Sequence, residues 1–393
     1  MNGPSLATGQ RSLGDPSITY PLWPPLTRGC PRTSTASLAY PVEVDYDYAR
    51  VSATLFEQEP GPDLARWSPL LPPLHAPTLG EGGTPLIPLE GVYVKDESRN
   101  PTWSHKDRLN RVAVSAAVGA GAPGVVVASS GNHGASAAAY AARAGLPAIV
   151  LASADAPPAV HSLVRAYGAK VLAVPVEARW PLMREIVDRL GYHPVSNLTV
   201  THTGHPFGAE GYKTIAYELF LQLGRVPAAV FAPTGYAELL YGVWKGFTEL
   251  RRLGLAGSTP RMFSCEPAVG GPHARAVATG APAAIVSLGH TDAYGIGGSV
   301  GGHRGVRAVR DSDGEALLVT DEEMRAAQRA LARQGLWQEL SGAAGLAAYR
   351  RLGRDFDGPV VCVATSSGFK DVGVGSETVE VLSEPTMEDV LKA

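Results

Sequence analysis

The chain has 393 residues, of which 45% are hydrophobic and 18% are charged, and its formal net charge is −3. This composition supplies enough apolar side chains for a sizeable core and excludes bulk disorder. The Lys and Arg residues form no cluster, which argues against nucleic-acid binding, and the longest apolar runs are too short to span a membrane.

Residues 1–70 are predicted to form an N-terminal arm and a small helical segment. Residues 1–40 are rich in Pro, Gly, Ser and Thr without periodicity, which is typical of an extended, partly mobile arm. One helix is expected near residues 46–56. The N-terminus lacks the apolar core of a signal peptide, so we expect a cytoplasmic location. The cysteines lie far apart, which predicts neither a disulfide framework nor a bound metal: Cys30, Cys265 and Cys362.

A regular alternation of short strands and helices follows in the first half of the chain. Strands are expected at residues 91–94, 124–129, 148–152 and 170–176. Helices are expected at residues 106–121, 132–144, 159–167 and 179–190. Strands separated by helices of this length predict βαβ units and a largely parallel sheet.

The same alternation recurs in the second half. Strands are expected at residues 228–233, 261–266 and 359–365, and helices at residues 209–223, 237–253, 321–334 and 341–352. Residues 268–318 are dense in Gly and lack periodicity, which predicts irregular loops around a site. We therefore predict an α/β fold of two lobes with a site between them. The smaller domain is expected at 71–207 and the larger at 208–393.

Lys106 is the first candidate for chemistry, because it stands at the start of a predicted helix with Ser104 as a plausible cap. Unpaired N–H groups and the positive end of the helix dipole favour a neutral amine there, and a neutral amine can attack an aldehyde. The alternative is a solvated first-turn lysine paired with Asp107 or Glu97. The segment alone favours this second interpretation.

Three further segments place small or hydroxyl residues where a strand ends. SSGNHG at 129–134 and PTGYAEL at 233–239 each lead into a helix, whose first N–H groups suit a carboxylate or a phosphate. TSSG at 365–368 follows the last predicted strand with three hydroxyl side chains. Taken singly, each segment is more typical of an ordinary α/β turn.

Together and in this order, the four segments resemble the threonine synthase branch of the fold-type-II pyridoxal-phosphate (PLP) enzymes, within the tryptophan synthase beta superfamily. NPTWSHKDR at 100–108 is similar to the family's lysine motif NPTGSFKDR, and TSSGFKD at 365–371 to its TGHGLKD. LGEGGTPL at 79–86 and EGYKTIAYEL at 210–219 are also family-like. The resemblance covers residues 78–372. With this resemblance, the interpretation of Lys106 as a nucleophilic amine is favoured over that of a solvated first-turn lysine.

The resemblance implies that pyridoxal 5'-phosphate binds Lys106 as a Schiff base, and that the freed lysine later removes the substrate's Cα proton. Ser104 and His105 are the other catalytic candidates. The implied cofactor-binding residues are Lys106, Asn132, Thr234, Gly235, Tyr236, Ala237, Glu238, Leu239 and Thr365. The implied substrate-binding residues are Trp103, Ser129, Ser130, Gly131, Asn132 and His133. A hydroxyl partner such as Thr365 leaves the ring nitrogen largely unprotonated, which suits elimination or replacement at Cβ or Cγ.

Departures from the family pattern surround the expected ligands. Trp103 stands where the family has Gly, and His105 stands where it has Phe. His105 is either a proton donor or substrate ligand, or a packed core histidine. Glu238 replaces a glycine of the phosphate loop and adds a negative charge beside an expected dianion. These changes put the substrate in doubt more than the fold or the cofactor.

Three functions are compatible with these residues. The first is a PLP-dependent lyase or synthase that forms threonine from O-phosphohomoserine. The second is β-replacement on O-phosphoserine or a similar substrate, as in cysteate synthase-like enzymes. The third is a catalytically silent relative, which the intact Lys106, Asn132 and Thr365 argue against. The expected partner is a small amino-acid substrate, without nucleic acid or membrane, in a possible homodimer.

Overall fold

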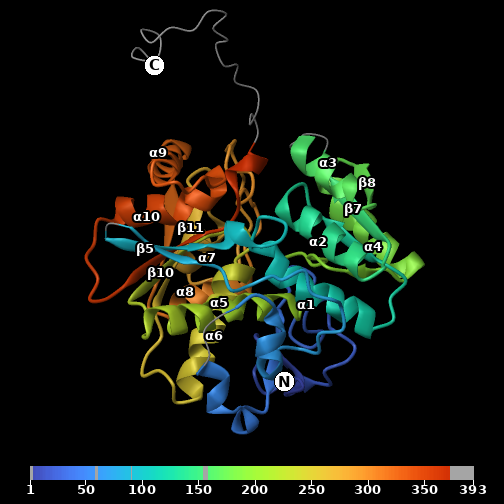
Figure 1. Ribbon diagram of the computed structural model, residues 1–393. Helices are drawn as coiled ribbons and strands as arrows, with labels where there is room; N and C mark the ends of the chain where they lie inside the picture. Colours follow the sequence, from blue (N-terminus) through green and yellow to red (C-terminus); the bar gives the residue numbers. More distant parts are fainter. Residues whose placement is uncertain (1–2, 58–60, 90, 154–157, 372–393) are drawn as a thin grey trace, which may run out of the picture.

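Two lobes, each built on a β-sheet flanked by helices, form the protein (Figure 1). The structure is a computed structural model and describes residues 3–57, 61–89, 91–153 and 158–371. This arrangement confirms the predicted α/β fold. Among the described residues no helix combines the length and the apolarity needed to cross a membrane.

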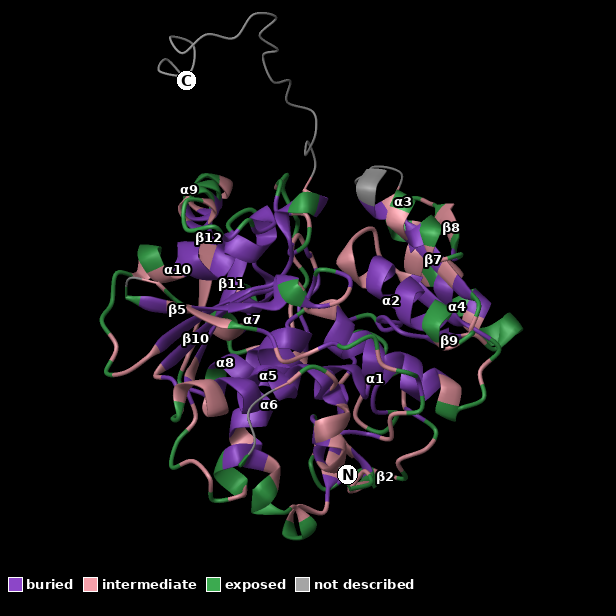
Figure 2. Ribbon diagram, in the orientation of Figure 1, coloured by how far each residue is buried: buried purple, intermediate pink, exposed green. Residues whose placement is uncertain are grey.

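The larger lobe contains a six-stranded sheet that is parallel except at its last strand. In spatial order the strands are β12 (Glu315–Val319), β11 (Arg261–Pro267), β10 (Ala229–Pro233), β13 (Val360–Ala364), β5 (Val92–Asp96) and β4 (Leu86–Leu89). One face packs against α5 (Gly208–Leu223), α6 (Glu238–Arg252) and α8 (His303–Arg310), and the other against α9 (Asp321–Ala332) and α10 (Ala344–Leu352). The four inner strands β11, β10, β13 and β5 are almost wholly buried (Figure 2), whereas the edge strands β12 and β4 are only partly buried.

The smaller lobe contains a four-stranded, wholly parallel sheet. Its strands are β8 (Lys170–Ala173), β7 (Ala148–Ala152), β6 (Val125–Ala128) and β9 (His193–Pro194). Its helices are α1 (Lys106–Gly119), α2 (Asn132–Arg143), α3 (Pro158–Ala166) and α4 (Arg179–Leu190). The predicted bounds of β7 and α4 coincide with the observed ones, because β7 is one short apolar run and the apolar residues of α4 recur at helical spacing.

Close helix packing in the larger lobe depends on glycine. A Cβ at Gly246 of α6 would lie 2.4 Å from the carbonyl oxygen of Lys213 in α5. A Cβ at Gly211 of α5 would lie 2.0 Å from the carbonyl oxygen of Arg108 in α1. Any larger residue would therefore push these helices apart. The tight contact joins α1, which begins at Lys106, to the larger lobe.

The N-terminal prediction is wrong in part. The segment expected as an arm contributes β1 (Ala7–Ser12) and β2 (Thr19–Tyr20), which form an antiparallel sheet with β3 (Val42–Tyr46). The helix expected at 46–56 is replaced by the end of β3 and two short 3₁₀ turns. Alternate residues of β3 carry apolar side chains, and this period of two produces a strand.

Residues 268–318 contain more regular structure than predicted, since α7 (Pro272–Thr279), α8 and β12 lie within them. Both helices are only eight residues long, about two turns each, so their patterns are too short to stand out among the surrounding glycines. The proposed division at residues 71 and 207 stays a prediction. The sheets depart from this division at one place. β4 and β5 lie within residues 71–207, the range predicted to form the smaller domain, but they pair within the larger sheet.

Candidate active site

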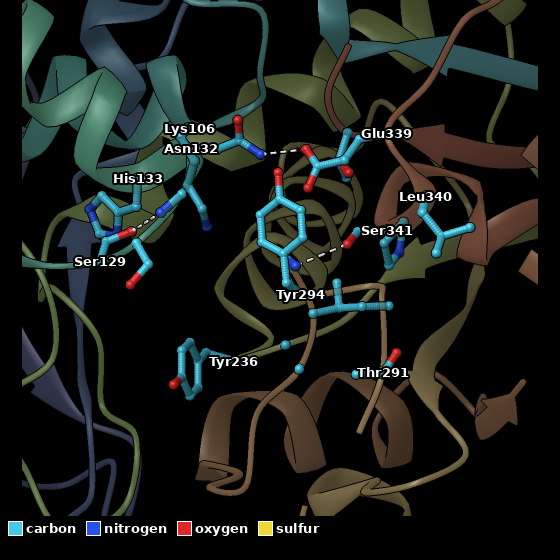
Figure 3. A pocket seen from close by; sticks show the side chains of 18 of the residues that line it. Lys106, Ser129, Asn132, His133, Tyr236, Thr291, Tyr294, Glu339, Leu340 and Ser341 are labelled. Carbon is cyan, nitrogen blue, oxygen red and sulfur yellow. Dashed lines mark hydrogen bonds between the residues drawn. The ribbon is translucent and has the colours of Figure 1, made fainter. Parts of the chain in front are cut away.

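A cavity of about 710 Å³ lies between the two lobes. Most of the predicted site residues line it: His105, Lys106, Ser129, Ser130, Gly131, Asn132, His133, Gly235, Tyr236, Ala237, Glu238, Leu239 and Thr365. Three do not: Trp103, Ser104 and Thr234. Figure 3 shows Lys106 and Asn132 on one side of the cavity, with Tyr294 and Glu339 facing them.

The Lys106 amine is held at the cavity by its own helix and by a neighbouring tyrosine. Lys106 is the first residue of α1, and its backbone N–H donates to the Ser104 hydroxyl at 3.3 Å, although the capping position belongs to His105 and not to Ser104 as predicted. Its Nζ donates to the buried Tyr212 hydroxyl at 3.1 Å. Burial lowers the pKa of the Lys106 amine, although the Glu238 carboxylate opposes this effect. The amine is therefore more easily neutral than in water, as a nucleophilic lysine must be.

Arg108 fixes the first turn of α1. Its guanidinium is fully buried and contacts Glu97 at 2.7 Å and Glu218 at 2.6 Å. It also donates to Thr84 and Thr214, so that all of its nitrogens have acceptors. Because the Glu218 side chain belongs to α5, this network joins the lysine-bearing helix to the larger lobe.

His105 has a packing role in this structure. Its backbone N–H and its Nδ1 both lie within hydrogen-bond distance of the Thr365 carbonyl, at 2.9 and 3.1 Å. Its ring stacks on Tyr212, with centroids 5.4 Å apart. Burial lowers the pKa of His105 well below its usual range, and the nearby Lys106 charge adds to this. The packed interpretation of His105 is thus supported over the proton-donor one.

The Asn132 carboxamide is held between the two lobes. Its Nδ2 donates to Glu339 Oε2 at 2.7 Å, while its Oδ1 accepts from Lys370 Nζ at 2.7 Å and from the Ser366 hydroxyl at 3.2 Å. Glu339 is fully buried and its Oε1 has no hydrogen-bond partner among the described residues. Asn132 lies in the first turn of α2, beside the loop expected to bind a carboxylate.

The predicted phosphate loop forms a turn into α6. Ala237 has φ 61°, and α6 begins at Glu238, so the first backbone N–H groups of the helix remain without helical acceptors. The Glu238 carboxylate accepts the backbone N–H of His205 at 3.2 Å. Thr234 differs from its predicted role, because its N–H donates to Cys265 and its hydroxyl to Ala232.

Trp103 also differs from its predicted role as a substrate ligand. Its side chain is 50% exposed and lies outside the cavity lining. The backbone there adopts φ 59°, a left-handed conformation that favours glycine. This backbone conformation explains why the family has a glycine at this position. The Trp103 side chain does not reshape the wall of the pocket.

Sequence reasoning missed several residues of the site: Arg179, Tyr212, Tyr294, Glu339 and Lys370. Some of these residues come from segments far from the four motifs. Others lie within family-like stretches in which no role was assigned to them. Tyr212 and Lys370 lie inside EGYKTIAYEL and TSSGFKD, so the resemblance contained a signal for them. Glu339 precedes a small-residue helix start and carries no local signal of its own.

Comparison with known proteins establishes the family. Residues 77–366 match the model of the family described as pyridoxal-phosphate dependent enzyme, and the chain belongs to this family. Its cofactor is pyridoxal 5'-phosphate. The fold agrees, since the structure of maize serine racemase superposes with a TM-score of 0.64 over 75% of this chain and 89% of that one, at 22% identity.

Within the family, the chain is similar to threonine synthases. It is 34% identical to the threonine synthase of Methanosarcina acetivorans over 374 residues, covering 88% of this chain and 89% of the relative. It is 35% identical to the threonine synthase of Synechocystis sp. over 336 residues, covering 80% and 85%. The predicted resemblance to the threonine synthase branch is thereby confirmed.

The residues of the cavity fit this cofactor. Lys106 supplies an amine whose protonated form is disfavoured, and the first turn of α6 supplies N–H groups for a phosphate. A Cβ at Gly235 would approach the Ile296 backbone to 3.3 Å, so that a larger residue would narrow this part of the cavity. The Glu238 carboxylate lines the same cavity, where it accepts the backbone N–H of His205.

Proposed function

We propose that this protein is a PLP-dependent synthase of the threonine synthase type, which releases phosphate from a small phosphorylated amino acid and replaces or eliminates the leaving group. The observation that carries the proposal is the Lys106 amine, held on the cavity wall with a lowered pKa. The similarity to threonine synthases supports O-phosphohomoserine as the substrate and threonine as the product.

The side chains of the cavity have separable tasks in this reaction. When bound, the cofactor would supply an electron sink that acidifies the proton on the substrate's Cα. Lys106, held by the Tyr212 hydroxyl at 3.1 Å, accepts that proton on Nζ and returns it later. The first turn of α2, which begins at Asn132 and His133, offers backbone N–H groups without helical acceptors to the substrate carboxylate.

Arg179 is suited to bind the substrate's phosphate. It is the first residue of α4, lines the cavity, and its Nη1 donates to the Ser130 hydroxyl at 3.2 Å. The Ser130 oxygen also accepts the backbone N–H of Ser153 at 2.7 Å, which leaves its own proton for a ligand. Two donors of this kind, one of them charged, match a phosphate oxygen.

Substrate turnover tests the proposal directly. Purified protein is incubated with O-phosphohomoserine and, separately, with O-phosphoserine, while phosphate release and product mass are followed. We expect phosphate release and threonine from the four-carbon substrate. Turnover of O-phosphoserine alone would rule out threonine synthase activity and favour β-replacement.

A variant of the lysine separates catalysis from silent ligand binding. Lys106→Ala is expected to abolish turnover and the visible absorbance of the bound cofactor. If the wild-type protein shows no such absorbance, or if the variant keeps it, the cofactor role of Lys106 is wrong. The homodimer and the cytoplasmic location stay predictions, and light scattering of the purified protein tests the first.

A further inference from the structure

Lys370 is a buried cation that connects the two lobes beside Asn132. It ends the short turn Gly368–Lys370 after β13 in the larger lobe, and its side chain is only 4% exposed. Its Nζ donates to Asn132 Oδ1 at 2.7 Å and to the backbone carbonyl of Thr102. Thr102 lies just before α1 and Asn132 is the first residue of α2, and both helices belong to the smaller lobe.

The carboxylates around Lys370 keep its amine protonated, so that it donates hydrogen bonds. Glu339 and Asp107 face it from the segment before α10 and from α1, and both favour its protonated form. Burial nevertheless lowers the pKa of Lys370 to about 8. His105, across from it, is held neutral by its own burial. At neutral pH Lys370 is therefore mostly an ammonium that can only donate hydrogen bonds.

The neighbours of Asn132 allow its carboxamide only one orientation. Its oxygen faces two donors, Lys370 and the Ser366 hydroxyl, and its nitrogen faces the Glu339 carboxylate. A rotation by 180° would place N–H groups against the ammonium and an oxygen against the carboxylate. Both charge-assisted hydrogen bonds would then be replaced by repulsive contacts.

We propose that Lys370 is a positioning residue, which holds the Asn132 carboxamide with its NH₂ group directed to the cavity. One N–H of that group binds Glu339, and the other remains for the ring oxygen of the cofactor. Lys370 thus acts on the cofactor through Asn132, without touching it. The inference rests on the proposed function insofar as the cavity binds this cofactor.

The test replaces Lys370 by Met, which keeps the length of the side chain but removes its charge and donors. The readouts are the dissociation constant of the cofactor and the pH midpoint of the bound cofactor's absorbance. Without Lys370 the carboxamide can rotate, so the anionic ring oxygen loses a donor. We expect about 10-fold weaker binding, the loss typical of one hydrogen bond to a charged group, and a midpoint moved to higher pH.

Two controls isolate the positioning role. Lys170→Met removes an exposed lysine at the start of β8 and is expected to change neither readout. In an Asn132→Ala background, Lys370→Met is expected to add little, because the residue through which it acts is absent. Lys370→Arg, which keeps the charge and the donors, is expected to restore most of the wild-type midpoint. Lys370→Leu, which also lacks a charge and donors, serves the same comparison if the Met variant fails to fold.

Two outcomes would overturn the inference. The first is a folded Lys370→Met protein with unchanged affinity and midpoint. The second is an equal midpoint shift with and without Asn132, which would assign the effect to the charge of Lys370 alone. The wild-type spectrum and its loss in Lys106→Ala are established beforehand, so a failure of the cofactor role itself is recognised separately.

Discussion

Replacing Arg108 by Leu tests the network that fixes the lysine-bearing helix. The wild-type guanidinium is fully buried between Glu97 and Glu218, at 2.7 and 2.6 Å. Its removal leaves two buried carboxylates with Lys95 as the remaining cation, 2.7 Å from Glu218. Breaking a buried pair in this way costs about 3–5 kcal/mol, because an uncompensated charge stays in the interior.

The pH dependence of this loss follows from Glu218. Burial alone would raise the pKa of Glu218, but Arg108 and Lys95 hold it well below its usual range. A carboxyl with a depressed pKa stabilises the fold above its unfolded pKa, and this contribution is lost as pH falls. In Arg108→Leu, Glu218 can take up a proton at higher pH. The difference in unfolding free energy between the two proteins should therefore narrow from pH 7 to pH 4.

Urea denaturation at both pH values measures this difference, with Arg189→Leu as the matched control. Arg189 forms an exposed pair with Glu185, with 75% and 55% of the side chains accessible, and its loss should cost less than about 0.5 kcal/mol. Arg108→Leu should also weaken cofactor binding, since Lys106 lies in the same helical turn. A loss below about 1 kcal/mol at pH 7, or a gap that widens in acid, would refute the reasoning.

Three further substitutions have expected outcomes. Trp103→Gly should raise the unfolding free energy by up to about 1 kcal/mol, because it relieves a left-handed backbone, and should leave substrate preference unchanged; a switch of preference in the turnover assay would contradict this. Burial raises the pKa of Glu238, so its contribution to stability is present at low pH and lost as pH rises. Glu238→Gln should therefore flatten the fall of the melting temperature as pH rises above 4.5, the ordinary pKa of a glutamate, and an unchanged slope would argue against this. Arg179→Gln should lower kcat/KM for a phosphorylated substrate by about 10- to 100-fold, with an unphosphorylated analogue binding as before.

The sequence predicted the repeated βαβ elements well and the N-terminal region poorly. The helix at Arg179–Leu190 and the strand at Ala148–Ala152 have strong periods and clear ends, so local pattern determines them. The strand Val42–Tyr46 is stable only because it pairs with β1 and buries against α5 and α6, and such pairing is not visible locally. The helices within residues 268–318 depend in the same way on the sheet they cover.

The residues of the candidate site likewise fall into those that a local sequence pattern predicts and those that it does not. Lys106, Asn132 and Thr365 stand at the ends of strands or the starts of helices, where a motif and its geometry are contiguous in sequence. Glu339 reaches Asn132 from 207 positions away, and no local pattern connects the two. Trp103 lies outside the cavity, and its backbone has a positive φ. The residue type alone does not predict this conformation.

The position of β5 has a consequence for how the attachment point of the cofactor is held. β5 pairs with β13 in the larger sheet, and the chain then runs directly into α1, which packs on α5. Lys106 and Thr365 thus share one rigid foundation, whereas the carboxylate loop and Arg179 stand on the smaller sheet. Because α1 packs on α5 as well as on α2, Lys106 is held against the larger lobe although its helix belongs to the smaller one. The attachment point of the cofactor therefore lies at the junction of the two lobes, where contacts from both sides fix it.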